Sequence, residues 1–308
     1  MINSFLERKS VNINLDTDGL LSYLFLKLGQ FKGEVSGFNN SHDLILSIYP
    51  TLEEMWDDTF VDIYVGRKDV WSIDQHVVAD TFEWCDYGEN KINPHLLIEN
   101  HIPNDDSYCR KFPFSTCLFI LAYLEKEKKI TTDINLLQPV NGKDFNLMDM
   151  VLRADGVLEN YIKYNKNIKD WSQKLIVFSN NGINTTKVID YLLHLSFDEA
   201  KEKSNKVSDF YISHGLTKDG GYNPKFPLKE NIQTLNQVLR SFAKYLNVSL
   251  TEWDCNLYMY KGKPSITSDW KDLTLSELDT YAFVGKTKLS YTYNFKKSNN
   301  RIEAKIYD

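Results

Sequence analysis

The sequence predicts an α/β protein. Its N-terminal half, residues 1–160, is expected to form a doubly wound, mainly parallel sheet, followed by a smaller α+β domain. Two observations support this. Short β-branched and aromatic runs near residues 11–15, 60–65 and 70–73 alternate with helical stretches, a pattern typical of parallel sheets. Each run carries or leads into acidic residues, and the carboxyl ends of such strands gather along one sheet edge.

Composition limits the classes of function. The chain has 308 residues, of which 42% are hydrophobic, which is enough for a sizeable core. A formal net charge of -6 argues against a broad basic face for long nucleic acid, whereas a small anionic substrate held by metal ions remains compatible. The four cysteines form no Cys-x-x-Cys pair, and no apolar run approaches a membrane span. We expect a cytoplasmic protein with reduced thiols and no membrane partner.

The first element is a strand over residues 11–15, followed by Asp16-Thr17-Asp18-Gly19 and a helix from Leu20 onward. Two carboxylates at a strand-to-helix turn can bind one hard divalent cation or bridge two. The same four residues also suit an ordinary turn and helix cap.

The next acid, Asp62, lies in the apolar run 60–65, where an unpartnered carboxylate would be costly to bury. A metal ion would be one partner; backbone amides or a neighbouring Arg or Lys would be another. The strand at residues 70–73 then leads directly into Asp74-Gln75-His76. At one sheet edge, we expect five side chains to converge: Asp16, Asp18, Asp62, Asp74 and His76.

This ordered series resembles the motifs of the DHH phosphoesterases, a superfamily that includes RecJ exonucleases, oligoribonuclease/pAp phosphatases, cyclic-dinucleotide phosphodiesterases and family II inorganic pyrophosphatases. The segment Asn14–Gly19 resembles the first motif in its RecJ-like form, Asp62 the second, and Asp74-Gln75-His76 the third. Residues 110–116, which enter an apolar helix at Cys117, resemble the helix start that follows the third motif. The resemblance covers about residues 10–160.

The resemblance implies a metal centre with one or two Mn²⁺ or Mg²⁺ ions. Its ligands would be Asp16, Asp18, Asp62 as a bridge, and a fourth-motif aspartate, with His76 as a further ligand or as the group that contacts phosphoryl oxygens. For the fourth motif we favour Asp155, because it follows an apolar helical stretch and precedes a glycine, and we hold Asp149 in reserve. The catalytic set is His76, Asp74 and Gln75, and the substrate-binding set is His76, Asn14 and His101.

Three residues depart from the family pattern. Gln75 stands where the family has a histidine that commonly binds a metal, and a glutamine carbonyl is a weaker, neutral ligand. Asn12 stands where the pyrophosphatase-like members have a histidine, so that form is disfavoured. Asn14 replaces an acid of the RecJ-like members. These changes are compatible with an altered metal site or with a protein that has lost hydrolysis.

The remaining sequence is less informative. The long polar loop over residues 80–106 contains His95 and His101, each of which either serves the site or is structural. Residues 161–210 are predicted as a helical linker, and residues 211–308 as an α+β domain that caps the substrate. No Gly-Gly-Gly-His loop of the superfamily type is present, and Asp219-Gly220-Gly221 is a weaker Gly-bearing turn. Tyr291, Tyr293 and Phe295 alternate on one strand and either stack on bases or pack in the core.

We therefore predict a divalent-metal-dependent phosphohydrolase, in which metal-activated water attacks phosphorus. The expected partner is a small phosphorylated substrate: a nucleotide, a cyclic nucleotide or a short single-stranded oligonucleotide. The chain is also compatible with a homodimer. Two alternatives stay open: a degenerate scaffold that binds or sequesters a nucleotide, and an interaction protein.

Overall fold

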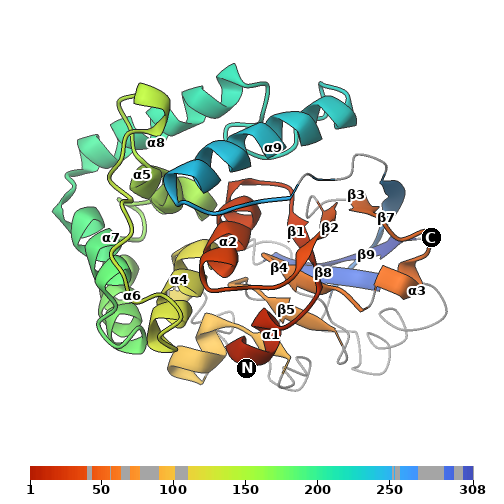
Figure 1. The fold of residues 1–308 in the computed structure, drawn as a ribbon, viewed down its shortest axis with the longest axis horizontal. Coiled ribbons are helices and arrows are strands. Elements are labelled where there is room, and N and C mark those ends of the chain that lie inside the picture. Colours follow the sequence, from red (N-terminus) through yellow and green to blue (C-terminus); the bar gives the residue numbers. More distant parts are fainter. Residues whose placement is uncertain are drawn as a thin grey trace.

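The computed structural model of the chain describes residues 1–39, 44–55, 57–63, 70–76, 90–100, 110–251, 253, 257–269, 288–294 and 301–307. Within these residues, nine strands form one mixed sheet with the order β6-β5-β4-β1-β2-β3-β7-β9-β8. Helices pack beside the parallel part of this sheet, and the antiparallel strands extend away from them (Figure 1). The predicted α/β class is confirmed.

The parallel part contains five strands. β1 (Ser10–Asn14) lies between β2 (Glu34–Asn39) and β4 (Thr59–Val61). On the far side of β4 follow β5 (Trp71–Ile73) and β6 (Lys91–Ile92). Parallel strands thus lie on both sides of β1. The carboxyl ends of β1, β4 and β5 meet at one edge of the sheet, where ligands bind in open α/β sheets.

The antiparallel part of the sheet combines strands from the N-terminal half with strands from the C-terminal end of the chain. β3 (Leu44–Ser47) pairs with β2 and with β7 (Tyr258–Asp269), and β9 (Arg301–Tyr307) pairs with β7 and β8 (Lys288–Asn294). The segment that we predicted as a separate C-terminal domain therefore contributes three strands to the sheet of the N-terminal half. The predicted boundaries at residues 160 and 210 stay predictions.

Two central helices form the core next to the sheet. α2 (Thr17–Leu28) and α4 (Thr116–Lys126) pack against each other, and both are buried over most of their length. Their apolar side chains point in all directions, which is typical of a helix enclosed by other elements. Each begins at a side-chain cap, from Asp16 and from Ser115. Two short helices, α1 (Ile2–Leu6) and α3 (Leu52–Met55), precede β1 and β4 in the chain.

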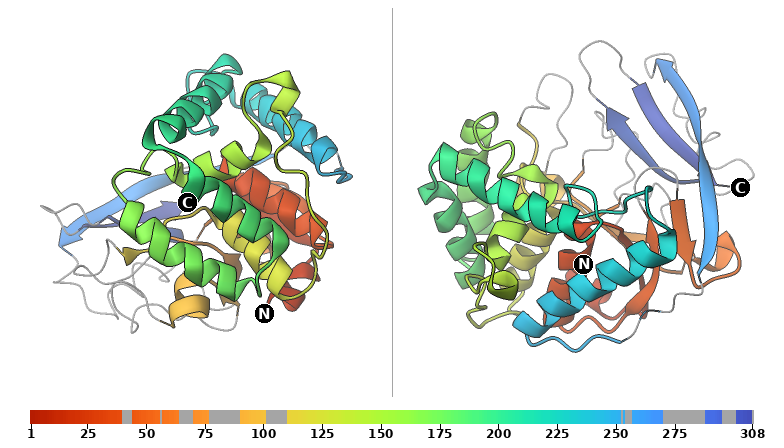
Figure 2. Two further views of the ribbon diagram at one scale, coloured as in Figure 1. Left: turned by 90° about the vertical axis from the view of Figure 1, so that its left-hand side faces the viewer. Right: turned by 90° about the horizontal axis from the view of Figure 1, so that it is seen from above.

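The later helices lie on the side of α2 and α4 (Figure 2), and the first of them is buried along its whole length. They are α5 (Leu147–Arg153), α6 (Asn165–Phe178), α7 (Ile183–His194), α8 (Phe197–Ser213) and α9 (Leu228–Tyr245). The predicted helical linker thus contains α6, α7 and most of α8. Among the described residues, none of the helices combines the length and the apolar character needed to cross a bilayer.

Candidate metal centre

The turn between β1 and α2 holds Asp16 at the N-cap of α2, where its carboxylate accepts the amide hydrogen of Gly19 at 3.0 Å. A Cβ atom at position 19 would lie 2.2 Å from the carbonyl oxygen of Asn14, so the turn closes this tightly only with glycine. Burial raises the pKa of Asp16 to about 6; the Gly19 amide opposes that rise, and the negative charge of Asp155 adds to it.

Asp18 connects the two central helices. Its two carboxylate oxygens accept the backbone amides of Thr116 and Cys117, each at 2.7 Å, so it binds the N-terminus of α4. Burial, followed by repulsion from Asp155 and Asp16, raises its pKa well above the ordinary range. Asp18 therefore joins the acidic cluster through charge, while its carboxylate is already engaged by α4.

Asp62 follows β4 directly. The strand ends at Val61, and Asp62 adopts a left-handed backbone with φ of 61°, so our placement of this acid inside a strand was wrong. The left-handed residue breaks the pleat and turns the carboxylate toward α4, where Thr116 Oγ1 donates to it at 2.8 Å. Burial and the charges of four neighbouring aspartates, Asp18, Asp16, Asp155 and Asp74, raise its pKa well above normal.

Asn14 lies between two of these carboxylates. Its side-chain amide donates to Asp16 at 2.7 Å and to Asp62 at 3.0 Å, and the side chain is buried at the end of β1. We predicted that Asn14 binds substrate. That role stays a prediction; in this position the amide group also fixes Asp16 relative to Asp62, because it supplies one hydrogen to each carboxylate.

The triplet after β5 orients a histidine. Asp74 is buried, and its Oδ1 lies 2.7 Å from Nδ1 of His76. Its Oδ2 is also buried and has no hydrogen-bond partner among the described residues. The His76 side chain is 40% exposed, and its Nε2 lies 3.9 Å from the carboxylate of Asp155. Desolvation opposes the imidazolium, but Asp74 and Asp155 outweigh it and raise the pKa of His76 to about 9.

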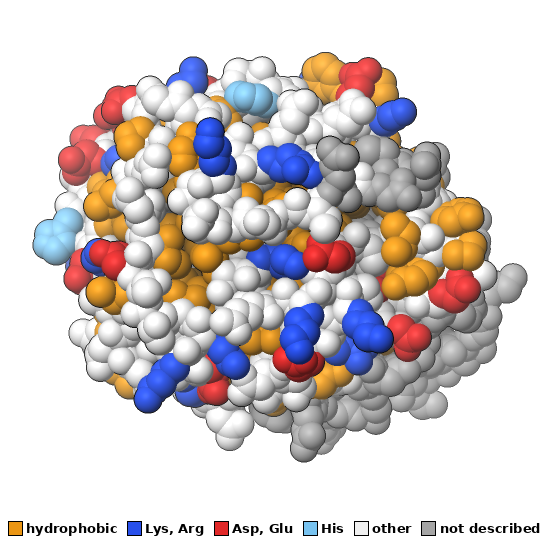
Figure 3. Space-filling model, in the orientation of Figure 1, with side chains coloured by type: hydrophobic (Ala, Val, Ile, Leu, Met, Phe, Trp, Pro, Cys, Tyr) orange, Lys and Arg blue, Asp and Glu red, His pale blue; other side chains and the backbone are white. Residues whose placement is uncertain are grey.

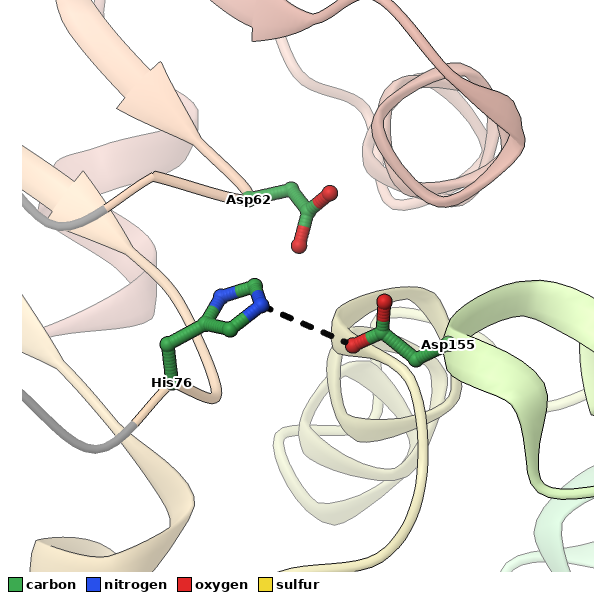
Figure 4. Close-up of side chains that lie close together, drawn as sticks. All are labelled: Asp62, His76 and Asp155. Carbon is green, nitrogen blue, oxygen red and sulfur yellow. Dashed lines mark ion pairs between the residues drawn. The ribbon is translucent and has the colours of Figure 1, made fainter. Parts of the chain in front are cut away.

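Asp155 completes the site from the other side. It lies in the short turn η4 (Ala154–Gly156) after α5, with a left-handed φ of 52°, and Gln75 donates its side-chain amide to the carboxylate. One ligand atom each from Asp62, His76 and Asp155 lies within 4.8 Å of the others, and Figure 4 shows the three side chains converging on one space. Burial raises the pKa of Asp155, although the positive charges of His76 and Lys111 oppose the rise.

Two hollows adjoin this cluster. The larger, of about 300 Å³, is lined by Asp16, Asp18 and Asp155 together with Arg153, Glu159 and Asp219. The smaller, of about 130 Å³, is lined by Gln75, Lys111, Tyr164 and Asp155, among others. Both are lined by Asp155, Gly156 and Asn160, so the two hollows are neighbours.

Other predicted site residues lie elsewhere. Asp149 is buried in the capping box of α5 and accepts from the hydroxyl of Tyr191 at 2.6 Å, so of the two fourth-motif candidates only Asp155 joins the cluster. His95 is buried, accepts the amide of Phe112 at 3.1 Å and packs edge-on against Trp171. His101 lies outside the described residues, as do the side chains of the aromatic stripe at 291–295.

Arg153 and Thr116 belong to the site, but our sequence reasoning assigned neither a role. Thr116 lies in the helix start that the motif comparison singled out, so its position was visible although its bond to Asp62 was not. Arg153 occurs two residues before Asp155 and directly after the apolar run Met150–Leu152, and the cation at that place was the available signal.

No family model matches the chain, and neither the curated proteins nor the solved structures include a match.

Proposed function

We propose that the protein is a divalent-metal-dependent phosphohydrolase that acts on a small nucleotide, a cyclic nucleotide or a short oligonucleotide. The observation that carries the proposal is the convergence of Asp62, His76 and Asp155 from three separate elements, with Asp16 and Asp74 beside them. The proposal includes a doubly wound sheet, which the position of β1 between β2 and β4 supports. Ligands of such sheets bind where the strand order reverses.

The donor set fits a hard or borderline divalent cation. Carboxylate oxygens together with one imidazole nitrogen suit Mn²⁺, and carboxylates alone suit Mg²⁺. The crowding of carboxylates supports the same assignment, because burial raises the pKa of Asp18, Asp62 and Asp155 and repulsion between neighbouring aspartates adds to the rise, a cost that a bound cation would offset. When bound, such a cation would lower the pKa of water and draw charge from a phosphoryl group.

His76 and Asp74 would act on the substrate as a pair. Asp74 holds Nδ1 of the imidazole, which leaves Nε2 facing Asp155 and the cluster. In the neutral ring, the Nδ1 hydrogen donates to Asp74 and Nε2 is a free ligand atom; in the imidazolium, Nε2 donates to a phosphoryl oxygen. Without a cation, Asp74 and Asp155 raise the pKa of His76 and favour the imidazolium; a bound cation would oppose that charge and favour the neutral ligand form.

The size and charge of the surroundings support a small substrate. The larger hollow, of about 300 Å³, reaches the lower end of the volume range of small-molecule sites, and the adjoining hollow adds about 130 Å³. On the face in Figure 3, basic and acidic side chains alternate and do not form one basic surface. A long duplex would require such a surface, because counterion release from its phosphates dominates binding.

The test is hydrolysis of a panel: pAp, pApA, cyclic dinucleotides, short single strands and pyrophosphate, each with Mn²⁺ and with chelator. We expect metal-dependent cleavage of at least one substrate by the parent protein and its loss in Asp62→Ala. Asp149→Asn is the matched control, because Asp149 is equally buried but lies outside the cluster. Equal cleavage by the parent and Asp62→Ala would refute the assignment.

A second candidate function is nucleotide binding without turnover. The hydrogen bond from Gln75 to Asp155 favours it, because the amide engages a carboxylate oxygen that a cation would otherwise take. The same panel tests this function with the parent protein in Mn²⁺, Mg²⁺ and Co²⁺. Saturable binding of a nucleotide, with no cleavage in any of the three metals, would select it.

A further inference from the structure

Arg153 is a buried cation at the edge of the larger hollow. It is the last residue of α5, its side chain is 3% exposed, and it lines the hollow together with Asp16, Asp18 and Asp155. Its Nε donates to Ser208 Oγ at 3.3 Å, which fixes the guanidinium relative to α8. A guanidinium presents paired donors in a fixed plane and is the usual protein group for binding phosphate.

Two carboxylates hold the same guanidinium. Asp219 accepts from Nη2 at 2.6 Å, and Glu159 lies 3.4 Å from the same nitrogen. Both acids are about half exposed, at 55% for Asp219 and 45% for Glu159, whereas Arg153 is not. Either acid can therefore swing into solvent, while Arg153 stays in place.

The loop that carries Asp219 lies directly on the metal centre. Gly220 adopts a left-handed φ of 76°, and a Cβ atom there would lie 2.0 Å from Oγ1 of Thr17. The next residues continue this contact, because the amide of Tyr222 donates to the carbonyl of Leu15 at 3.0 Å. The loop 217–222 thus brings Asp219 from a distant part of the sequence to the β1–α2 turn.

We propose that Arg153 binds a phosphate group of the substrate and that Asp219, assisted by Glu159, occupies Arg153 until the substrate displaces it. The carboxylate of Asp219 forms an ion pair with the guanidinium and thereby takes the place of a substrate anion. Arg153 also lines a hollow that includes three further aspartates, Asp16, Asp18 and Asp155. A phosphate that reaches this hollow replaces one anion by another, so Arg153 keeps a charged partner throughout. This inference names the substrate-anchoring residue of the proposed phosphohydrolase and rests on that function for its role in turnover.

The test is calorimetric titration of the full-length protein with inorganic phosphate, in Mn²⁺ and again in chelator. We expect Arg153→Gln to weaken phosphate binding at least tenfold, since a charge-assisted bond to a buried guanidinium is lost. We expect Asp219→Asn to tighten binding several-fold, because the competing charge is removed. Asp144→Asn, which breaks the surface pair between Asp144 and Lys206, is the control and leaves binding unchanged.

Two outcomes would overturn the inference. One is parental phosphate affinity in Arg153→Gln; the other is weaker binding in Asp219→Asn, which would make the ion pair a support of the hollow. If Arg153→Gln does not fold, Arg153→Lys and Asp219→Asn decide, with weaker and tighter binding expected respectively. If phosphate binding depends on Arg153 but no substrate in the panel is cleaved, the phosphohydrolase function fails and the phosphate site stands.

Discussion

Replacing Asp62 with asparagine separates folding stability from metal binding. Asp62 Oδ2 accepts from Asn14 and Oδ1 from Thr116, and an asparagine side chain can keep both contacts if the threonine hydroxyl reverses its role and accepts. The substitution removes one buried negative charge and nothing else of similar size. The metal-free protein should therefore become more stable.

The expected magnitude follows from the cluster geometry. The nearest ligand atoms of Asp62 and Asp155 lie within 4.8 Å, and at an effective dielectric constant of about 20 two charges at that separation repel by about 3 kcal/mol. Partial protonation and the charge of His76 reduce this, so we expect a gain of about 1–3 kcal/mol in the free energy of unfolding at pH 8. For a chain of this size that is a rise of about 2–5 °C in Tm.

In Mn²⁺ we expect the opposite order of stability, with the parent protein more stable than Asp62→Asn. At 100 times its dissociation constant, a cation stabilises the parent by about 2.7 kcal/mol. A 100-fold loss of affinity in Asp62→Asn would leave about 0.4 kcal/mol at the same concentration. Thermal unfolding in chelator and in Mn²⁺ measures both effects.

The control is Asp149→Asn. It removes a buried aspartate that caps α5 and accepts from Tyr191, so it should lower Tm while leaving the Mn²⁺-dependent increase intact. If Mn²⁺ raised the Tm of Asp62→Asn as much as that of the parent, Asp62 would not belong to a metal centre.

Three further predictions concern the same cluster. Metal-free protein should lose stability as pH rises from about 4 to about 6: burial raises the pKa of Asp16 to about 6, so over this interval the folded state holds a proton that the unfolded state has released. Urea unfolding in chelator at several pH values measures this loss of unfolding free energy. Asp16→Asn should make the unfolding free energy less dependent on pH, and the parental pH dependence in that variant would contradict a raised pKa of Asp16. His76→Gln should lower kcat about 100-fold, and Asp74→Asn should also lower it because the imidazole loses its orienting partner, both measured on whichever substrate the parent cleaves. Parental kcat in either variant would exclude the pair from catalysis. Gln75→His should raise Mn²⁺ affinity about tenfold by adding a nitrogen ligand and releasing Asp155, and unchanged affinity in the titration would show that position 75 lies outside the metal shell.

The short motifs made much of this arrangement predictable. β1, β4 and β5 were recognisable from compact β-branched runs, and the acids after them follow the rule that parallel strands end at one edge. The predicted helical linker over residues 161–210 likewise covers α6, α7 and most of α8. Asp155 was chosen over Asp149 because a glycine follows it, and that glycine has a φ of 72° in the turn that aims Asp155 at the cluster.

Long-range pairings were not predictable. Residue spacing does not reveal that β7 joins β3, because antiparallel pairing between distant segments leaves no local periodic signal. The same applies to Asp219, which reaches Arg153 across 66 residues, and to Thr116, whose hydroxyl meets Asp62 across 54. A sequence pattern identifies which side chains can bind a ligand, whereas tertiary contacts decide which of them already have a partner.

Two acids of the cluster occupy left-handed backbone, and this bears on why they are aspartates. Asp62 has φ of 61° and Asp155 has φ of 52°, a conformation that costs an ordinary residue about 1–2 kcal/mol. Asparagine tolerates it as well as aspartate and carries no charge. At both positions the chain therefore places a carboxylate among other carboxylates, where asparagine would keep the same backbone and be more stable. The proposed divalent cation would offset this cost, because it would gain from each negative charge, and the left-handed backbone directs the two carboxylates toward His76 and toward each other.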